Sequence, residues 1–233
     1  MRIYGTVTKG IAFVKPEHIK SLRLRVRDQV IVIDEKGIEY LGEVKSINKG
    51  IVKIRRYEGK TTEEEKKILI CFGILKRRET DEVVKKLCDI GVSEIYPFLS
   101  SHCSFSPPPP EKRNSMHSRW VRIARESSQV TRLPATIVKP LMTFEEVLEK
   151  TKNTESKFIF WEKADRNIES LLNLNKEIKT VCLVIGPEGG FSEREIREAG
   201  KNGFVKIGLG RKIMKSNIFS IYVASIVDFL INR

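Results

Sequence analysis

One segment is especially informative about the architecture: residues 181–196, with the sequence VCLVIGPEGGFSEREI. Its first five residues form a short apolar run, which is typical of a buried strand. A Gly-Pro-Glu-Gly-Gly turn at residues 186–190 ends that run. Ser192 and Glu195 have the spacing of a capping box, which predicts that a helix begins there. A strand, a glycine-rich turn and a helix N-terminus in succession place backbone N–H groups around one small concave site.

A second glycine-containing segment lies at residues 209–215, with the sequence LGRKIMK. It also ends an apolar run and precedes a helical pattern. Because two such turns at the ends of neighbouring strands can build one ligand pocket, we expect a site lined by Ile185, Gly186, Pro187, Glu188, Gly189, Gly190, Leu209, Gly210, Ile213 and Met214.

The residue types in these turns limit the kind of ligand. Neither turn contains a P-loop or a dinucleotide-binding fingerprint. Glu188 would repel phosphate, and it suits a ligand that carries positive charge. S-adenosylmethionine fits this description because it has a sulfonium and an ammonium group. The alternative is a tight strand-to-helix turn without any ligand, because glycine serves turns in general.

Length and composition limit the protein class. The chain has 233 residues, enough for one large domain or two small ones, and 40% of them are hydrophobic, which supports a real core. It has no apolar run long enough for a membrane helix and no signal peptide at its N-terminus. Its four cysteines have no zinc-site spacing, and Cys71 and Cys182 lie in apolar runs. We therefore expect a reduced, cytoplasmic protein with no membrane segment and no metal.

The charge balance is strongly basic. There are 43 Lys and Arg residues against 30 Asp and Glu residues, a net charge of +13. This excess favours a nucleic-acid partner; the alternative is a lysine-rich surface of the kind found in heat-adapted proteins. Within residues 18–27 the arginines stand at alternate positions, which in an extended segment would direct them one way toward phosphates. The expected RNA contacts are Lys20, Arg23, Arg25 and Arg27, unless they form a solvated strand face.

The two parts of the chain differ in pattern. Residues 1–67 contain short β-branched runs separated by tight turns, which suggests a small barrel with strands at 11–14, 29–33, 39–44 and 50–54. Residues 68–233 alternate between strand and helix patterns, which predicts a mainly parallel sheet with helices on both faces. Strands are expected at 68–72, 94–99, 157–161, 180–185 and 204–209, and helices at 80–90, 118–130 and 216–231. The proline run at 106–110 is expected to be extended. The last helix is apolar nearly all round, so it needs cover, for which a subunit interface is one source.

The segment IGPEGGFS at residues 185–192 resembles the signature of the ribosomal RNA uracil-N3 methyltransferases that modify small-subunit RNA. This family belongs to the SPOUT superfamily of knotted methyltransferases. The segment at 209–215 resembles its second loop. Further similar segments follow in family order over nearly the whole chain, at 18–24, 86–92, 96–98, 119–132 and 161–164.

This resemblance implies an α/β fold with two domains. Residues 1–67 would form a PUA-like β-barrel that binds RNA, and residues 68–233 a SPOUT α/β knot with a mainly parallel sheet, threaded by residues 183–215. The chain would be a homodimer that uses S-adenosylmethionine to methylate N3 of a specific uridine in 16S ribosomal RNA, as free RNA or in the small ribosomal subunit. Arg211 would stabilise charge on a uracil oxygen or a phosphate. Glu126 would position the base or accept its proton; alternatively it is a surface charge that pairs with Arg122 or Arg125.

The chain departs from the family pattern at several positions. His102 stands where the family usually has arginine, although a lone histidine after a strand is more often structural. Thr131 stands where glycine is usual, and Asn217 and Ile218 replace a Glu-Thr pair. Loss of that carboxylate keeps two other hypotheses open. The first is a divergent paralogue that binds RNA without methyl transfer, and the second is a ribose 2′-O methyltransferase.

Overall fold

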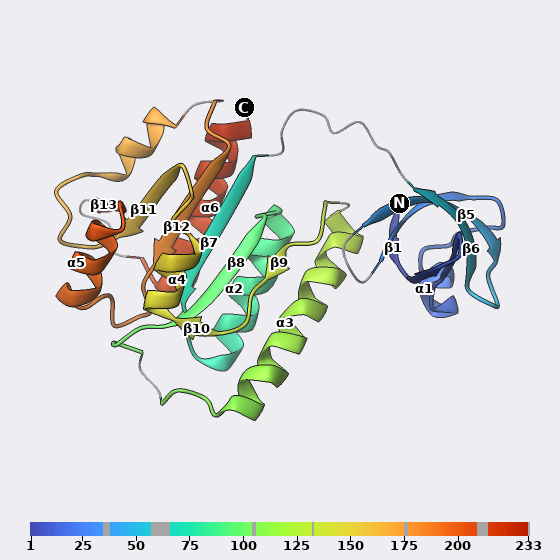
Figure 1. Cartoon of the computed structure of the whole chain (residues 1–233), viewed down its shortest axis with the longest axis horizontal. Helices are drawn as coiled ribbons and strands as arrows, with labels where there is room; N and C mark the ends of the chain where they lie inside the picture. Colours follow the sequence, from blue (N-terminus) through green and yellow to red (C-terminus); the bar gives the residue numbers. More distant parts are fainter. Residues whose placement is uncertain are drawn as a thin grey trace. The chain divides into compact units, whose positions relative to one another are not determined.

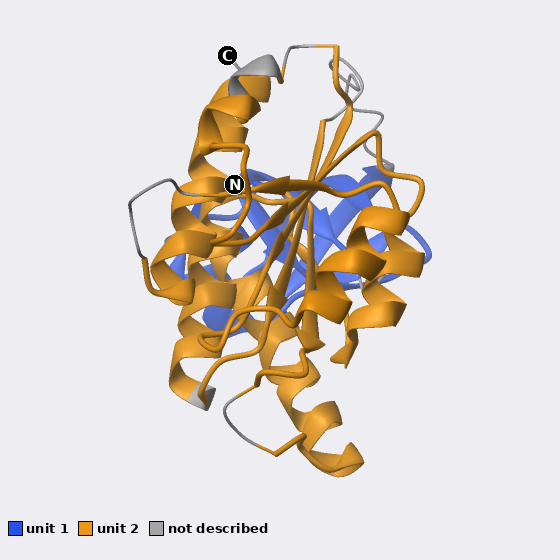
Figure 2. Cartoon of the chain, turned by 90° about the vertical axis from the view of Figure 1, so that its left-hand side faces the viewer, with its two compact units in different colours: residues 1–63, 128–133 blue, residues 64–127, 134–233 orange. Residues whose placement is uncertain are grey.

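The computed structural model describes residues 1–34, 38–56, 66–103, 106–131, 133–174, 177–208 and 214–232, apart from the side chains of residues 56, 77, 172 and 173. The chain divides into two compact units (Figure 2). Unit 1 consists of residues 1–63 and 128–133, and unit 2 of residues 64–127 and 134–233. The predicted segments that overlap residues 35–37, 57–65, 104–105, 132, 175–176, 209–213 and 233 lie partly outside the described residues.

Unit 1 contains a curved six-stranded sheet with the order β1-β4-β5-β6-β3-β2 (Figure 1). Strand β1 runs parallel to β4, and the other neighbours are antiparallel. The four strands predicted in this region are all present, as β3 to β6. The first two strands, β1 and β2, were not predicted. The bounds are Arg2–Tyr4 (β1), Thr6–Thr8 (β2), Ile11–Phe13 (β3), Gln29–Ile33 (β4), Glu39–Ser46 (β5) and Ile51–Arg56 (β6).

The basic segment 18–27 is not extended, so the expected conformation there was wrong. Helix α1 (Pro16–Ser21) carries Lys20, and Arg23 and Arg27 have φ angles of 53° and 80°. The chain turns because Leu24 is buried while its N–H donates to the carbonyl of Ile19 at 3.1 Å. The three arginines and Lys20 are nonetheless all exposed.

Unit 2 contains a parallel sheet with the order β10-β8-β7-β12-β11-β13, and β9 pairs with β8 (Figure 1). Every pairing in this sheet is parallel, as predicted. The predicted strands of residues 68–209 appear with ends shifted by a few residues, and the two-residue strands β9 and β10 are additional. The bounds are Lys67–Gly73 (β7), Glu94–Leu99 (β8), Ile137–Val138 (β9), Met142–Thr143 (β10), Ser156–Phe160 (β11), Thr180–Ile185 (β12) and Val205–Ile207 (β13).

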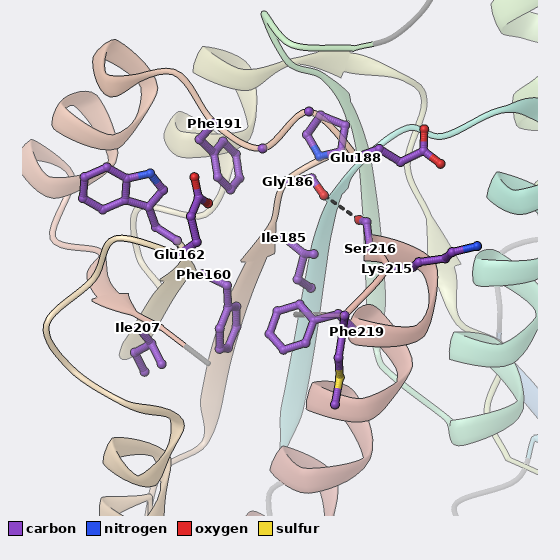
Figure 3. A pocket seen from close by; sticks show the side chains of 15 residues that line it. Phe160, Glu162, Ile185, Gly186, Glu188, Phe191, Ile207, Lys215, Ser216 and Phe219 are labelled. Carbon is purple, nitrogen blue, oxygen red and sulfur yellow. Dashed lines mark hydrogen bonds between the residues drawn. The ribbon is translucent and has the colours of Figure 1, made fainter. Parts of the chain in front are cut away.

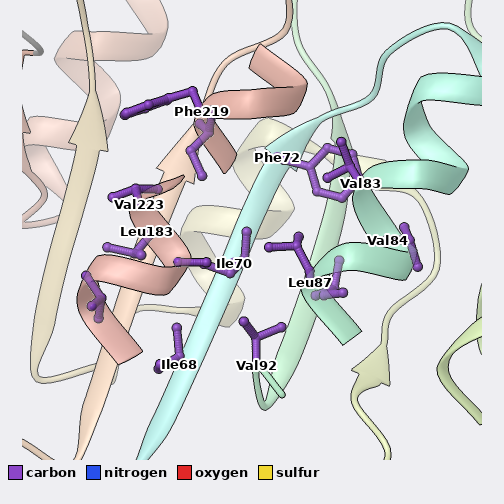
Figure 4. Close-up of a cluster of buried hydrophobic side chains, with 14 of the residues drawn as sticks. Ile68, Ile70, Phe72, Val83, Val84, Leu87, Val92, Leu183, Phe219 and Val223 are labelled. Atoms are coloured by element: carbon purple, nitrogen blue, oxygen red, sulfur yellow. The ribbon is translucent and has the colours of Figure 1, made fainter. Parts of the chain in front are cut away.

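Helices cover both faces of the parallel sheet, which confirms that prediction. Successive residues of β7 enter two different clusters of buried side chains: Ile70 joins one and Cys71 the other. The first cluster contains side chains of α2, α3 and α6, and Figure 4 labels those of α2 and α6. The second cluster contains side chains of α4 and α5. The helices are α2 (Arg77–Ile90), α3 (Pro110–Thr131), α4 (Phe144–Lys150), α5 (Glu193–Lys201) and α6 (Ser216–Asn232), with a 3₁₀ helix at Ile168–Asn173.

The helix ends show which local signals were decisive. The predicted capping box is present at the start of α5: the Ser192 hydroxyl accepts from the Glu195 N–H. Helix α2 ends as predicted at Gly91, which has a φ of 92°. Helix α3, however, begins at Pro110 and not at residue 118. Proline is well accommodated in the first turn of a helix, where its missing N–H has no partner to lose, so the last proline of the run starts the helix.

Two further predictions concern buried residues. Cys71 and Cys182 lie in the core, as predicted, and burial raises the pKa of the Cys71 thiol well above its ordinary value. Helix α6 buries one side against α2, β7 and β12, while Ile218, Tyr222 and Phe229 are exposed on this chain.

None of the described helices combines the length and the apolar character that crossing a membrane requires.

Candidate active site

A cavity of about 590 Å³ opens in unit 2 beyond the carboxyl ends of β11 and β12 (Figure 3). Parallel strands bring their carboxyl ends to the same edge of a sheet, and ligands of open α/β sheets bind outside that edge. The turn at 186–190 therefore faces segments that are distant in sequence. The cavity is lined by Phe160, Trp161, Glu162, Ile185, Gly186, Pro187, Glu188, Gly189, Gly190, Phe191, Ile207, Met214, Lys215, Ser216 and Phe219.

The floor of the cavity is apolar. The rings of Phe160 and Phe219 meet edge to face, with centroids 4.8 Å apart and an interplanar angle of 81°. Ile185 and Ile207 are buried beside them. An apolar floor with a few polar groups at the rim is the usual composition of a small-molecule site.

Two glycines at the glycine-rich turn, Gly73 on β7 and Gly189 in the turn itself, have no room for a side chain. A Cβ added to Gly73, on β7, would lie 2.5 Å from Cδ and 2.6 Å from N of Pro187. A Cβ added to Gly189 would lie 2.6 Å from the carbonyl oxygen of His102. The His102 ring also lies against this turn, with Nδ1 3.2 Å from the Gly189 carbonyl oxygen. This contact agrees with a structural part for His102.

Glu195 connects the start of α5 to the loop that follows β8. Its carboxylate accepts from the backbone N–H of Ser101 at 3.0 Å and from that of Ser192 at 2.8 Å. The side-chain hydroxyls of Ser101 and Ser192 also donate to this carboxylate, each at 2.9 Å. Burial alone raises the pKa of Glu195, but these hydrogen bonds outweigh burial, so the pKa lies below its ordinary value. The capping residue thus holds two loops together as well as its own helix.

Helix α6 holds the other end of the turn. The Ser216 hydroxyl, in the first turn of α6, donates to the carbonyl of Gly186 at 2.5 Å (Figure 3). Met214 and Lys215 line the cavity just before this helix. Met214 and Lys215 therefore line the same cavity as the turn at 186–190. The prediction that two glycine turns build one pocket requires this arrangement.

The structure places the expected site residues as follows. Seven of the ten expected cofactor contacts line the cavity: Ile185, Gly186, Pro187, Glu188, Gly189, Gly190 and Met214. Leu209, Gly210, Arg211 and Ile213 lie outside the described residues.

Glu126 does not line the cavity. It lies on an exposed side of α3, with a carboxylate oxygen 3.9 Å from Nε of Arg122, and both side chains are about two-thirds exposed or more. Lys20, Arg23, Arg25 and Arg27 belong to unit 1 and do not line the cavity either.

Several lining residues were not predicted from the sequence. Trp161 and Glu162 follow β11, Ile207 ends β13, and Ser216 and Phe219 start α6. A usable signal existed for the first pair, because a predicted parallel strand ending at residue 161 brings its end to the edge where the glycine turn lies. No local pattern indicates that Phe219 turns toward this edge. Among the described residues, no group of three or more His, Cys, Asp or Glu side chains is placed to hold a metal ion.

Comparison with known proteins assigns the chain to a family. A model described as an RNA methyltransferase domain matches residues 62–228, and one described as an RNA methyltransferase PUA domain matches residues 17–55. Ribosomal RNA small subunit methyltransferase E of Mesomycoplasma hyopneumoniae is 30% identical, over 88% of this chain and 87% of the relative. The protein of the same name from Bacillus subtilis is 22% identical, over 91% and 85% of the two chains.

Solved structures agree on the fold. A Legionella pneumophila methyltransferase solved with bound S-adenosylmethionine has a TM-score of 0.77 at 21% identity, covering 98% of this chain and 96% of its own. Ribosomal RNA small subunit methyltransferase E of Neisseria gonorrhoeae, also bound to S-adenosylmethionine, has a TM-score of 0.76 at 20% identity, with the same coverage. The predicted fold class is confirmed as an α/β chain with an N-terminal PUA-like domain and a C-terminal domain built on a parallel sheet. The chain therefore belongs to the RNA methyltransferase family, together with ribosomal RNA small subunit methyltransferase E.

Proposed function

We propose that this protein transfers the methyl group of S-adenosylmethionine to N3 of a specific uridine in 16S ribosomal RNA. The observation that carries the proposal is the cavity at the carboxyl edge of the parallel sheet, in a chain of the RNA methyltransferase family. The relative from Mesomycoplasma hyopneumoniae, named for the small ribosomal subunit, supports this class of substrate.

The lining residues fit S-adenosylmethionine. The apolar floor of Phe160, Ile185 and Phe219 suits the adenine ring and the methylene groups of the cofactor, and two carboxylates at the cavity, Glu162 and Glu188, suit its positive charges. When bound, this molecule supplies an electrophilic methyl group. The close approach of the backbone at Gly189 leaves room only for a turn without side chains there.

The reaction sets two tasks for the chain. The uracil N3 must lose its proton and then bond to the methyl carbon, while the carbon–sulfur bond breaks and sulfur keeps the electron pair. The chain must hold the two reactants in line and stabilise negative charge on the uracil. In our proposal Arg211 stabilises charge on a uracil oxygen or a phosphate, and Glu126 positions the base or accepts its proton.

We infer that residues 1–67 bind RNA and that residues 68–233 hold the cofactor. The exposed cations Lys20, Arg23, Arg25 and Arg27 support the first inference, because such groups contact phosphates without reading bases. Affinity for RNA should then fall steeply as salt rises.

We also infer a homodimer that acts in the cytoplasm. The exposed side chains of Ile218, Tyr222 and Phe229 on α6 are apolar surface that a second subunit would cover. A cytoplasmic location follows from the proposed substrate, because that is where small-subunit RNA is assembled.

Nucleoside mass spectrometry tests the proposal. The protein is incubated with S-adenosylmethionine and with small-subunit RNA that lacks the modification, both free and assembled, and the RNA is then digested. We expect 3-methyluridine. A methylated ribose would instead identify a 2′-O methyltransferase. Absence of methyl transfer with intact cofactor binding would favour the divergent RNA-binding paralogue that Asn217 and Ile218 suggest.

A further inference from the structure

Two carboxylates line the cavity, and they are oriented differently (Figure 3). The side chain of Glu188 is directed away from the apolar floor, whereas that of Glu162 is directed toward the glycine turn, where its carboxylate comes close to Gly190. A positively charged part of a ligand inside the cavity would therefore meet Glu162 first.

The position of Glu162 is set by the sheet. It follows β11 by two residues, and the N–H of the intervening Trp161 donates to the carbonyl of Ile207 at 2.9 Å. Its two carboxylate oxygens lie 3.7 and 3.9 Å from the point where a Cβ on Gly190 would be. Gly190 has a φ of 70°, which disfavours any side chain there. The carboxylate thus borders the space that the glycine turn keeps open.

The charge of Glu162 is uncompensated within the described part of the chain, where it has no hydrogen-bond or ion-pair partner. The neighbouring Lys163 instead pairs with Glu193 at 3.6 Å and lies 5.8 Å from the Trp161 ring. A carboxylate beside an apolar floor, at the end of a strand and without a partner among the described residues, is available to a cationic ligand group.

We propose that Glu162 binds the ammonium group of S-adenosylmethionine; this inference rests on the proposed function. The sulfonium is the other candidate partner, but its charge disappears during methyl transfer. A carboxylate held against it would stabilise the reactant more than the transition state and would slow the reaction. The ammonium group keeps its charge throughout, so pairing with it strengthens binding without this cost.

Calorimetry with two ligands tests the assignment. S-adenosylhomocysteine, the product, keeps the ammonium group but has no sulfonium charge. We expect Glu162→Gln to weaken the binding of both ligands by a similar factor of about ten. A loss confined to S-adenosylmethionine would assign Glu162 to the sulfonium and overturn the ammonium contact. Unchanged affinity for both ligands would overturn any contact of Glu162 with the cofactor.

Three controls make the result specific. A desamino analogue of S-adenosylhomocysteine should bind wild type and Glu162→Gln equally, because the partner of the carboxylate is missing. Glu193→Gln removes a nearby exposed carboxylate that does not line the cavity and should bind both ligands as wild type does. In turnover, Glu162→Gln should raise KM for S-adenosylmethionine and leave kcat nearly unchanged. If the wild-type protein binds neither ligand, the proposed function itself fails.

Discussion

Two regions of the cavity are built in different ways. The turn at 186–190 is held from outside: Ser216 donates to the Gly186 carbonyl, and Glu195 ties the following helix to Ser101. The rim instead carries the exposed charged side chains of Glu162, Glu188 and Lys215. Side chains that bond to other residues of the chain hold the shape of the cavity. The charged side chains at the rim remain available for a ligand. The following substitutions test this division.

The largest effect is expected for Gly73→Ala. Its new Cβ would press on the Pro187 backbone, which cannot rotate away as a side chain can. We expect a loss of about 3 kcal/mol in the free energy of unfolding, with loss of S-adenosylmethionine binding. Urea denaturation and calorimetry measure the two quantities.

Gly200→Ala is the matched control for this substitution. Gly200 lies in α5, and its new Cβ would come no closer than 3.9 Å to the flexible Lys206 side chain. Alanine should stabilise this helix by up to about 1 kcal/mol. Wild-type cofactor binding by Gly73→Ala would show that the cavity does not need the contact between β7 and the turn.

Glu195→Gln should come next. The glutamine amide keeps the shape of the side chain but replaces one acceptor oxygen with an NH₂ donor. That donor would face the N–H and O–H donors of Ser101 and Ser192. We expect a loss of about 2 kcal/mol in unfolding free energy and a raised KM for S-adenosylmethionine. Glu198→Gln, on the same helix, should leave both quantities near wild type because its carboxylate pairs with Lys201 in solvent.

Glu195 also predicts a pH dependence. Its folded-state pKa is lowered, so its stabilising contribution is fully present above the unfolded value of about 4.3. The contribution is lost as pH falls below that value and through the folded pKa. Wild type should therefore lose more stability on acidification through this range than Glu195→Gln does. Parallel curves for the two proteins in urea titrations would contradict the assignment.

A smaller effect is expected for Ser216→Ala. It removes one hydrogen bond to the Gly186 carbonyl, which should cost about 1 kcal/mol and raise KM for the cofactor. Ser225→Ala is the control, because that exposed serine on α6 only bonds back to the Ile221 carbonyl. A lower KM for the cofactor in Ser216→Ala than in the control would contradict this prediction. The hydrogen bond to Gly186 would then hold the turn in a conformation that weakens cofactor binding.

The smallest effect on stability is expected for Glu126→Gln. Its ion pair with Arg122 is long and exposed, so unfolding free energy should change by less than about 0.5 kcal/mol. The proposed part in proton transfer predicts instead a fall in kcat of about 100-fold. Arg122→Gln breaks the same pair and keeps the carboxylate, so its kcat should stay close to wild type. Equal kcat values in both variants would make Glu126 a surface charge.

Local signals were sufficient for much of the fold. The capping box at Ser192 and the glycine end of α2 depend on neighbouring residues only, and both were predicted correctly. The segment 18–27 was predicted wrongly because a burial contact, that of Leu24, outweighs the alternation of its arginines. The start of α3 at Pro110 was missed because the proline run looked extended as a whole.

The sequence by itself determined the strand, turn and helix of residues 181–196, the alternation that makes a parallel sheet, and the motif that relates the chain to its family. Only the tertiary structure decided that Gly73 meets Pro187, that Ser101 bonds to Glu195, and that Glu162 borders Gly190. The reason is the strand order: β12 lies between β7 and β11, so the sheet edge assembles residues from distant strands. A local periodicity depends only on residues within one element and carries no information about that order.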